Sequence, residues 1–140
     1  MTKKIYRKEG SSLYNCNYIV SFCTKYKRKV LTEEMRDSLK EIFNKISKTY
    51  DFNLKKISIS ENQVTLEIEC SPTLGIKTAI TKLKNGSATE MKELYPVLNS
   101  RIPSIWTRDS YIVTTGEFKP SDIEAFLKLQ KKYESYNVEE

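Results

Sequence analysis

The segment SENQVTLEIEC, residues 60–70, alternates apolar and polar side chains along its length. Apolar residues stand at every second position: Val64, Leu66, Ile68 and Cys70. This period-2 pattern is typical of a strand that buries one face and leaves the other open. The open face begins with Gln63 and Thr65, which point the same way because they are two residues apart. A chain built around such a strand needs neighbouring strands and a covering layer on the apolar side.

Three further segments have strand character, and two have helical character. NCNYIVSFCTKY and SYIVTTG are rich in β-branched and aromatic residues, and FNLKKISIS is joined to residues 62–70 by a tight SEN turn. LTEEMRDSLKEIFNKISKTY predicts an amphipathic helix with Thr32 as its N-cap. Its apolar stripe consists of Met35, Leu39, Ile42, Phe43 and Ile46. Up to residue 70 the order of these elements is strand, helix, strand, strand.

A second helix is expected after Pro72, with a pause near Asn85 and Gly86. Its inner face would carry Ile76, Ile80 and Leu83. With SYIVTTG as the last strand, the order predicts an α+β fold, a ferredoxin-like βαββαβ sandwich with an antiparallel sheet covered by helices on one face. Residues 120–136 predict an additional C-terminal helix, because Ser121 and Glu124 have capping-box spacing.

Length and composition limit the remaining possibilities. The 140 residues suffice for one domain, 1–140, of which the basic residues 1–12 are expected to be mobile. Lys and Arg number 24 against 18 Asp and Glu, so the net charge of +6 suits a polyanionic partner. The chain has no His, and its three Cys lack metal-ligand spacing, so neither a metal site nor a cofactor is expected. No membrane span or signal peptide is found, and the protein is expected to be cytoplasmic, with reduced, structural cysteines.

Three segments together resemble the single-tyrosine transposases of the insertion sequence 200/605 type, members of the HUH (His-hydrophobic-His) superfamily. SSLYNCNYIVSFCTKYKRKVL is similar to the family's opening strand and basic turn. KLKNGSA and WTRDSYIVTTG are similar to its second helix and closing strand, in the same order. The resemblance covers roughly residues 11 to 131.

The resemblance implies a specific chemistry. In the family, two histidines on the central strand and a glutamine on the C-terminal helix hold a divalent cation, and a tyrosine attacks the scissile phosphate of single-stranded DNA. The histidine positions fall on Gln63 and Thr65, the tyrosine position on Phe126, and the glutamine on Gln130. A further histidine position, in the first strand, falls on Ile19. Three of the four working groups are therefore replaced, and no catalytic or metal-binding residue is expected.

Simpler interpretations of the same residues stay open. Gln63 and Thr65 also suit an ordinary solvent-facing strand, and Phe126 suits a core position beside Ile123 and Leu127. Tyr133 is a conceivable relocated nucleophile, although it has no metal ligands to act with.

The candidate nucleic-acid contacts are basic and polar side chains. They are Arg7, Lys8, Lys25, Lys27, Arg28, Lys29, Lys82, Lys84, Ser87 and Arg108. The run KYKRK suits a phosphate clamp and a solvated turn about equally well. Trp106 is assigned to the core rather than to base stacking.

The sequence therefore predicts a catalytically inactive, domesticated transposase that binds hairpin or inverted-repeat DNA as a transcriptional regulator. The resemblance implies a homodimer, and neither a membrane nor a small-molecule substrate is expected as a partner. Binding can outlast cutting, because affinity rests on many surface contacts and catalysis on a few atoms. The alternatives are an RNA-binding module, a mixed-dimer inhibitor of an active relative, an enzyme of altered chemistry, and a remnant without a role.

Overall fold

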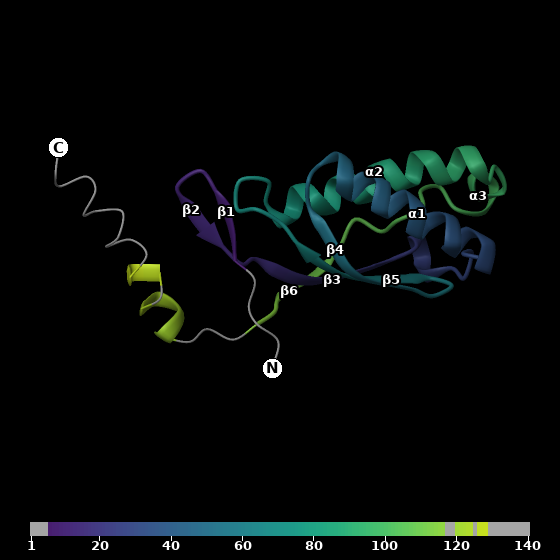
Figure 1. The fold of residues 1–140 in the computed structure, drawn as a ribbon. Coiled ribbons are helices and arrows are strands. Elements are labelled where there is room, and N and C mark those ends of the chain that lie inside the picture. The colour runs from purple at the N-terminus through teal and green to yellow at the C-terminus, as the bar shows by residue number, and fades with distance from the viewer. Residues whose placement is uncertain (1–5, 117–119, 125, 129–140) are drawn as a thin grey trace.

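The computed structural model describes residues 6–116, 120–124 and 126–128 of the chain. Its main sheet is antiparallel, in the spatial order β4-β5-β3-β6. The strands are β3 (Asn17–Cys23), β4 (Asn53–Ile59), β5 (Gln63–Glu69) and β6 (Tyr111–Thr114) (Figure 1). The connection from β3 to β4 runs through the first long helix and passes over β5. The connection from β5 to β6 runs through the second long helix and passes over β3. This arrangement confirms the predicted ferredoxin-like α+β fold.

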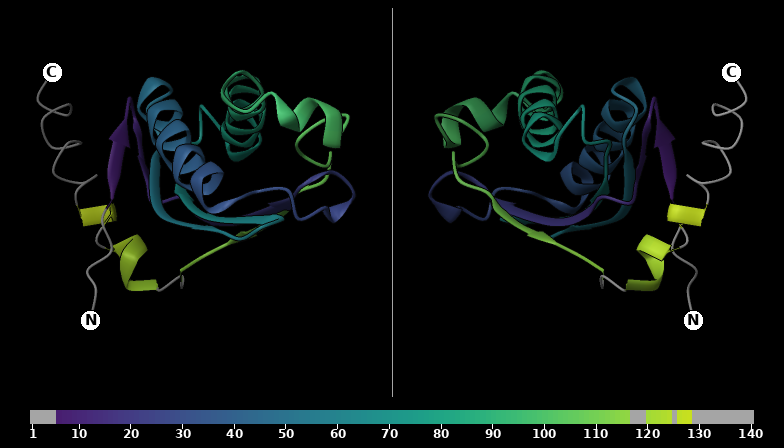
Figure 2. Two further views of the ribbon diagram at one scale, coloured as in Figure 1. Left: turned by 90° about the vertical axis from the view of Figure 1, so that its right-hand side faces the viewer. Right: turned by 90° about the vertical axis from the view of Figure 1, so that its left-hand side faces the viewer.

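Two long helices cover one face of the sheet. They are α1 (Glu33–Thr49) and α2 (Ile76–Leu94), and they lie side by side above the strands (Figure 2). A short helix, α3 (Val97–Arg101), follows α2. The Thr32 hydroxyl accepts a hydrogen bond from the Met35 amide at 3.2 Å, which confirms the predicted N-cap. Val64, Leu66 and Ile68 are buried beneath the helices, as their alternation requires.

Helix α2 runs through Asn85 and Gly86 without the pause expected from the sequence. The expectation was wrong because it treated Gly86 only as a helix breaker. In the structure the missing side chain lets α2 lie close to Ile46 on α1. Gly86 therefore serves helix packing, which outweighs its low helix propensity.

The N-terminal segment forms a small hairpin of its own. Strands β1 (Arg7–Glu9) and β2 (Ser12–Tyr14) pair antiparallel, and Gly10 has a φ of 56° in the turn between them. Glycine adopts this left-handed conformation without strain. Residues 7–12 of the segment expected to be mobile thus belong to a paired hairpin, and residues 1–5 lie outside the described part of the chain.

Residues 120–124 and 126–128 are helical and lie beyond the end of β6, apart from α1 and α2 (Figures 1 and 2). The helix already includes Pro120, so Ser121 lies within its first turn rather than before it. Phe126 is 40% exposed, and Ile123 and Leu127 are also exposed. The core interpretation of Phe126 is therefore wrong, because the described helix does not pack on the helical layer. The rest of the expected helix, to residue 136, lies outside the described residues.

Candidate nucleic-acid interface

The sheet face opposite the helices carries a row of hydroxyl side chains. The strand register pairs Ser58 with Thr65, Thr65 with Ser21, and Ser21 with Tyr111, across all four strands. Directly opposed residues project to the same side of a sheet. The row therefore crosses the open face, and Tyr111 at its end is 64% exposed.

The side chains at the two positions singled out in the sequence, Gln63 and Thr65, both contact Ser21 in this row. Gln63 Nε2 donates to Ser21 Oγ at 3.0 Å, and Ser21 Oγ lies 3.2 Å from Thr65 Oγ1. Ser21 Oγ also donates to the Val64 carbonyl at 3.1 Å. We refer to Ser21, Gln63 and Thr65 as the polar cluster. All of its side chains are neutral.

A pocket of about 640 Å³ opens beside the polar cluster. The residues that line it come from β3 and the turn after it, from the start of β5 with the turn before it, and from the start of β6 with the segment leading into it: Ser21, Phe22, Cys23, Lys27, Asn62, Gln63, Thr107, Asp109, Ser110 and Tyr111. This volume lies within the range of ligand sites in proteins. The lining mixes hydroxyl, amide, thiol and aromatic groups with one lysine and one aspartate.

The basic turn, residues 24–29, follows β3 at the same end of the sheet. It contains the short helix η1 (Lys25–Lys27) and is tied to its surroundings by backbone hydrogen bonds. Lys25 N donates to the Ile105 carbonyl at 2.8 Å, and Thr24 N donates to the Asn62 carbonyl at 2.9 Å. Lys27, Arg28 and Lys29 are exposed, and Arg28 Nη1 donates to the Arg101 carbonyl at 2.6 Å. The turn therefore has a fixed backbone, and its Lys27 lines the pocket.

Lys84, on helix α2, holds the segment that leads into β6. Its ammonium group donates to the carbonyls of Thr107, Arg108 and Asp109 at 2.9, 3.3 and 3.1 Å. Burial lowers the pKa of Lys84, while the nearby Asp109 carboxylate opposes that change. Because its ammonium group donates to three carbonyls, Lys84 anchors residues 107–109. The exposed Arg108 lies in this anchored segment.

Ser87 does not belong to any surface. It is fully buried, and its hydroxyl accepts a hydrogen bond from Trp106 Nε1 at 2.9 Å. The assignment of Ser87 as a nucleic-acid contact is wrong, because no ligand can reach it. Trp106 is a core residue, as predicted, and packs edge-on to Phe22 with 4.9 Å between the ring centroids.

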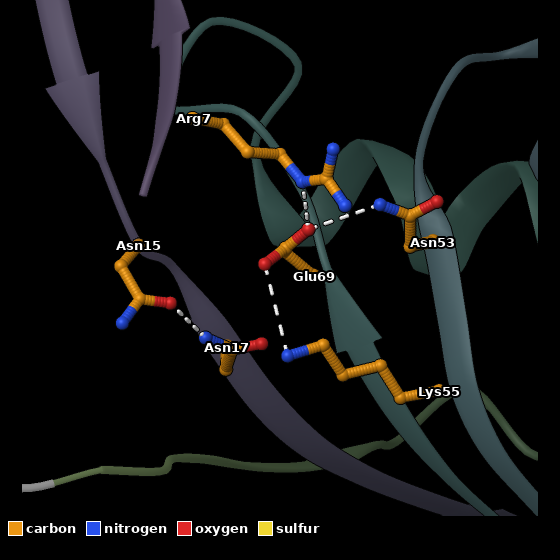
Figure 3. A network of polar contacts seen from close by, with 6 residues as sticks. All are labelled: Arg7, Asn15, Asn17, Asn53, Lys55 and Glu69. Atoms are coloured by element: carbon orange, nitrogen blue, oxygen red, sulfur yellow. Dashed lines mark hydrogen bonds and ion pairs between the residues drawn. The ribbon is translucent and has the colours of Figure 1, made fainter. Parts of the chain in front are cut away.

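Arg7 lies in an ionic network at the opposite end of β3 (Figure 3). It donates to the Glu69 carboxylate, which also accepts from Asn53 Nδ2 at 2.9 Å and lies 3.7 Å from Lys55 Nζ. The Glu69 side chain is only 2% exposed. Burial raises the pKa of Glu69, but the hydrogen bonds and charges of its partners outweigh burial and hold the pKa below its usual value. The network fixes the β1–β2 hairpin, which also carries Lys8, to the main sheet.

The predicted contacts therefore fall into separate groups. Lys25, Lys27, Arg28 and Lys29 gather near Arg108 at the Cys23 end of β3, whereas Arg7 and Lys8 lie at its Asn17 end, about 20 Å away. Lys82 lies elsewhere, on α2, with its ammonium 4.9 Å from the centroid of the Tyr50 ring. Phe126 lies on the C-terminal helix, and Gln130 and Tyr133 lie outside the described residues.

Sequence reasoning missed Tyr26, the aromatic residue inside the KYKRK run. It is 65% exposed, and two cationic groups, those of Lys25 and Arg28, lie over its ring. An aromatic residue within a basic run is the signal that identifies it, since nucleic-acid binders combine cations with stacking rings.

The cysteines are thiols, as expected. Cys16, Cys23 and Cys70 form no disulfide. Burial raises the pKa of the Cys70 thiol to about 11, so this group stays protonated and unreactive at neutral pH. Within the described ranges, no helix is long and apolar enough to cross a bilayer.

An antiparallel sheet with a helical layer on one face, a polar open face and a basic turn beside a pocket defines an α+β protein suited to a polyanionic ligand. Residues 12–130 match the family model described as "Transposase IS200 like". The chain belongs to this family of IS200-like transposases.

Individual relatives agree with this assignment. The ISDra2 transposase TnpA of Deinococcus radiodurans is 25% identical over 126 residues, which cover 89% of this chain and 90% of the relative. The transposase of insertion sequence element IS200 from Salmonella typhimurium is 22% identical, with 84% and 78% covered.

Two solved structures share the fold. A Deinococcus radiodurans protein described as a transposase superposes with a TM-score of 0.72 at 25% identity, covering 89% of this chain and 97% of that one. A REP-associated tyrosine transposase bound to a REP hairpin gives a TM-score of 0.57 at 9% identity, covering 89% and 67%. At 9% identity the second likeness concerns the fold alone.

Proposed function

We propose that this protein binds hairpin or inverted-repeat DNA without cutting it and acts as a transcriptional regulator. The observation that carries the proposal is the polar cluster beside the basic turn. Where the resembled transposases have metal-binding histidines, this chain has Gln63 and Thr65, joined through Ser21 by neutral hydrogen bonds. Phe126, at the nucleophile position, has no oxygen with which to attack a phosphate.

The polar cluster does not fit a divalent cation. Sites for hard cations normally include carboxylates, and the oxygens here are a carboxamide and two hydroxyls. Gln63 already donates to Ser21, and Ser21 already donates to a backbone carbonyl. A cation would have to displace these hydrogen bonds and would gain no negative charge in return. The cluster is better suited to hydrogen bonding with a nucleic acid than to polarising a phosphate.

The basic turn supports DNA as the ligand. Lys27 lines the pocket, Arg28 and Lys29 are exposed in the same turn, and the whole chain has a net charge of +6. Cations spaced along a turn neutralise successive phosphates, and this term supplies much of the affinity for nucleic acids. A structural neighbour with the same fold was solved with a REP hairpin. A folded single strand is therefore our proposed substrate class.

A homodimer belongs to the proposal. Strand β6 lies at the edge of the main sheet, with Tyr111, Ile112 and Val113 exposed. An edge strand of this kind can pair with its copy about a two-fold axis. A two-fold dimer would match an inverted-repeat site, whose half-sites have the same symmetry. Light scattering of the purified protein, with and without DNA, tests this point.

The central experiment measures affinity for a hairpin DNA, a fully paired duplex and a matched RNA hairpin over a range of salt concentrations. Two charge-removing changes, Lys27→Gln and Lys29→Gln, are compared with Lys40→Gln and Lys48→Gln on the exposed face of α1. The first pair should weaken binding and reduce the salt slope by about 0.9 per lost phosphate contact on a paired stem. The second pair should leave both unchanged. Arg28 is kept because it also bonds to the Arg101 carbonyl.

Each alternative gives a different result. Stronger binding to the RNA hairpin would favour the RNA-binding module, and co-purification with a histidine-bearing relative would favour the mixed-dimer inhibitor. A metal-dependent covalent adduct on a denaturing gel would reveal an active enzyme. The regulator proposal fails if the folded protein binds neither hairpin DNA nor any genomic DNA more tightly than random competitor DNA at moderate salt.

A further inference from the structure

We propose that Tyr26 is a stacking platform for an unpaired base of the bound DNA. This inference rests on the proposed function and adds a contact of a different kind, since the ring of Tyr26 is neutral. Three properties of the residue carry it: its backbone conformation, the rigidity of the basic turn, and an exposed ring with two cations close to it.

The backbone at Tyr26 lies in the left-handed region. Its φ is 59° and its ψ is 17°, and the next residue, Lys27, has a φ of 54°. Residues other than glycine, asparagine and aspartate seldom adopt this conformation, and bulky ones are true outliers. Such conformations persist only where the surrounding structure enforces them, and they gather at binding sites. A tyrosine is a poor choice here unless its ring has a use.

Hydrogen bonds on both sides enforce the conformation. Thr24 Oγ1 donates to the Arg28 carbonyl at 2.7 Å, which closes the turn. Lys27 N donates to the Thr24 carbonyl at 2.9 Å, and Asn62 Nδ2 donates to the Lys27 carbonyl at 3.2 Å. Thr24 itself is fully buried. The ring therefore projects from a fixed backbone, so a base that stacks on it orders little of the protein.

The ring itself is positioned for a ligand rather than for the core. It is 65% exposed and belongs to no buried cluster among the described residues. Lys25 Nζ lies 5.6 Å and Arg28 Cζ lies 5.7 Å from the ring centroid. An exposed aromatic ring that attracts mobile cationic side chains matches a nucleotide, whose base can stack on the ring in their place and whose flanking phosphates attract the displaced cations.

The geometry favours an unpaired base over a base in a stem. A paired base hides both faces within the helical stack, whereas a loop or bulge leaves one face free. The pocket lined by Lys27, Asn62 and Gln63 starts next to Tyr26 along the chain, so the adjoining nucleotide would meet amide and hydroxyl groups. Tyr26 would then distinguish a looped hairpin from a blunt duplex.

The test measures the affinity of the full chain for a hairpin DNA with an unpaired loop and for a blunt duplex with the same stem. Tyr26→Leu keeps an apolar side chain of substantial size, Tyr26→Phe keeps the ring, and Tyr50→Leu removes another exposed tyrosine with a cation over its ring. Tyr50 is the C-cap of the 17-residue helix α1, which puts it about 25 Å from that helix's start near the basic turn. It is therefore a matched control.

Tyr26→Leu should weaken hairpin binding by about 5- to 150-fold and leave duplex binding nearly unchanged, because stacking on one base is lost. The slope of affinity against salt should not change, in contrast to Lys27→Gln, because no charge is removed. Tyr26→Phe and Tyr50→Leu should bind like the wild type. A 2-aminopurine in the loop should be quenched by the wild type and by Tyr26→Phe, but not by Tyr26→Leu.

The possible failures are distinguishable. If the wild type does not bind the hairpin, the proposed function is overturned and this inference falls with it. If the wild type binds and Tyr26→Leu binds equally well without loss of quenching, only the inference is overturned.

Discussion

Gly86 on α2 lies directly against Ile46 on α1: a Cβ atom at position 86 would stand 2.7 Å from Ile46 Cδ1. Real Cβ atoms do not come this close to another carbon, so an alanine requires Ile46 to move. The Cδ1 atom is the far end of a side chain, but Ile46 is only 8% exposed and has little room. The two helices are thus fitted to each other at this point.

This contact predicts a coupled pair of substitutions. In the Ile46→Val background, which lacks the Cδ1 atom, Gly86→Ala should stabilise the protein by about 0.5–1 kcal/mol through its better helix propensity. In the wild-type background the displacement of Ile46 should offset that gain. Urea unfolding of the four proteins gives the coupling energy directly. Equal effects of Gly86→Ala in both backgrounds would contradict the contact.

The Glu69 network predicts a loss of stability in acid. The pKa of Glu69 is held below its ordinary value of 4.5, so its contribution is complete above that pH and is lost as the pH falls through the folded-state pKa. Glu69→Gln should be less stable at pH 7 by about 1–3 kcal/mol, because Arg7 and Lys55 lose a buried partner. Its unfolding free energy should also fall less between pH 5.5 and 3.5.

Glu67→Gln, on the open face of the same strand, is the control for this prediction, and it should retain the acid dependence of the wild type. Hydrogen exchange at residues 7–14 gives a second measurement, because loss of the Arg7 contact should release the β1–β2 hairpin. Unchanged protection of that hairpin in Glu69→Gln would show that Glu69 does not hold it.

The left-handed backbone at Tyr26 predicts that a glycine at this position keeps the protein stable while hairpin affinity is lost. Tyr26→Gly should be at least as stable as Tyr26→Ala, because glycine adopts a φ of 59° without strain whereas alanine does not. At most other exposed positions glycine is the less stable of the two. Both variants should bind the looped hairpin equally weakly. Thermal unfolding and hairpin affinity, measured on the same samples, check the two halves; a glycine variant clearly less stable than alanine would refute the strain.

Restoring the tyrosine alone should not restore cutting. Phe126→Tyr supplies a nucleophile, but under the proposed function it supplies no cation to offset charge on the phosphate, because Gln63 and Thr65 are neutral groups. We expect no covalent adduct with hairpin DNA and magnesium or manganese on a denaturing gel, and adding Gln63→His and Thr65→His is the informative comparison. Efficient cutting by Phe126→Tyr alone would mean that a working metal site exists.

Patterns within single elements were enough to predict most of the fold. The alternation around Val64 and the apolar stripe of the first long helix depend on local periodicity, and both elements form as expected. The β1–β2 hairpin could not be predicted in this way, because it is fixed by Arg7 and Glu69, which are 62 residues apart. The burial of Ser87 was likewise not predictable, because its hydrogen-bond partner Trp106 lies 19 residues further along the chain.

The site was predictable to a similar extent. The basic run identified its cations, and alternation placed Gln63 and Thr65 on the open face. The conformation of Tyr26 was not predictable, because it results from hydrogen bonds between the basic turn and residues far away in the sequence. The same holds for Lys84, whose carbonyl partners follow it by 23 to 25 residues.

The two faces of strand β5 serve different purposes. The even-numbered residues Val64, Leu66 and Ile68 face the core, and the odd-numbered residues Gln63, Thr65 and Glu67 face away from it. A mutation at Gln63, Thr65 or Glu67 therefore changes the chemistry of the open face with little effect on folding, whereas the buried Glu69 at the end of the strand is part of the structure. Selection for a folded protein and selection for a cutting protein therefore act on different residues of the same seven-residue strand. A lineage can lose the second without endangering the first, so a folded, non-cutting descendant is within reach of a few substitutions at the open-face positions.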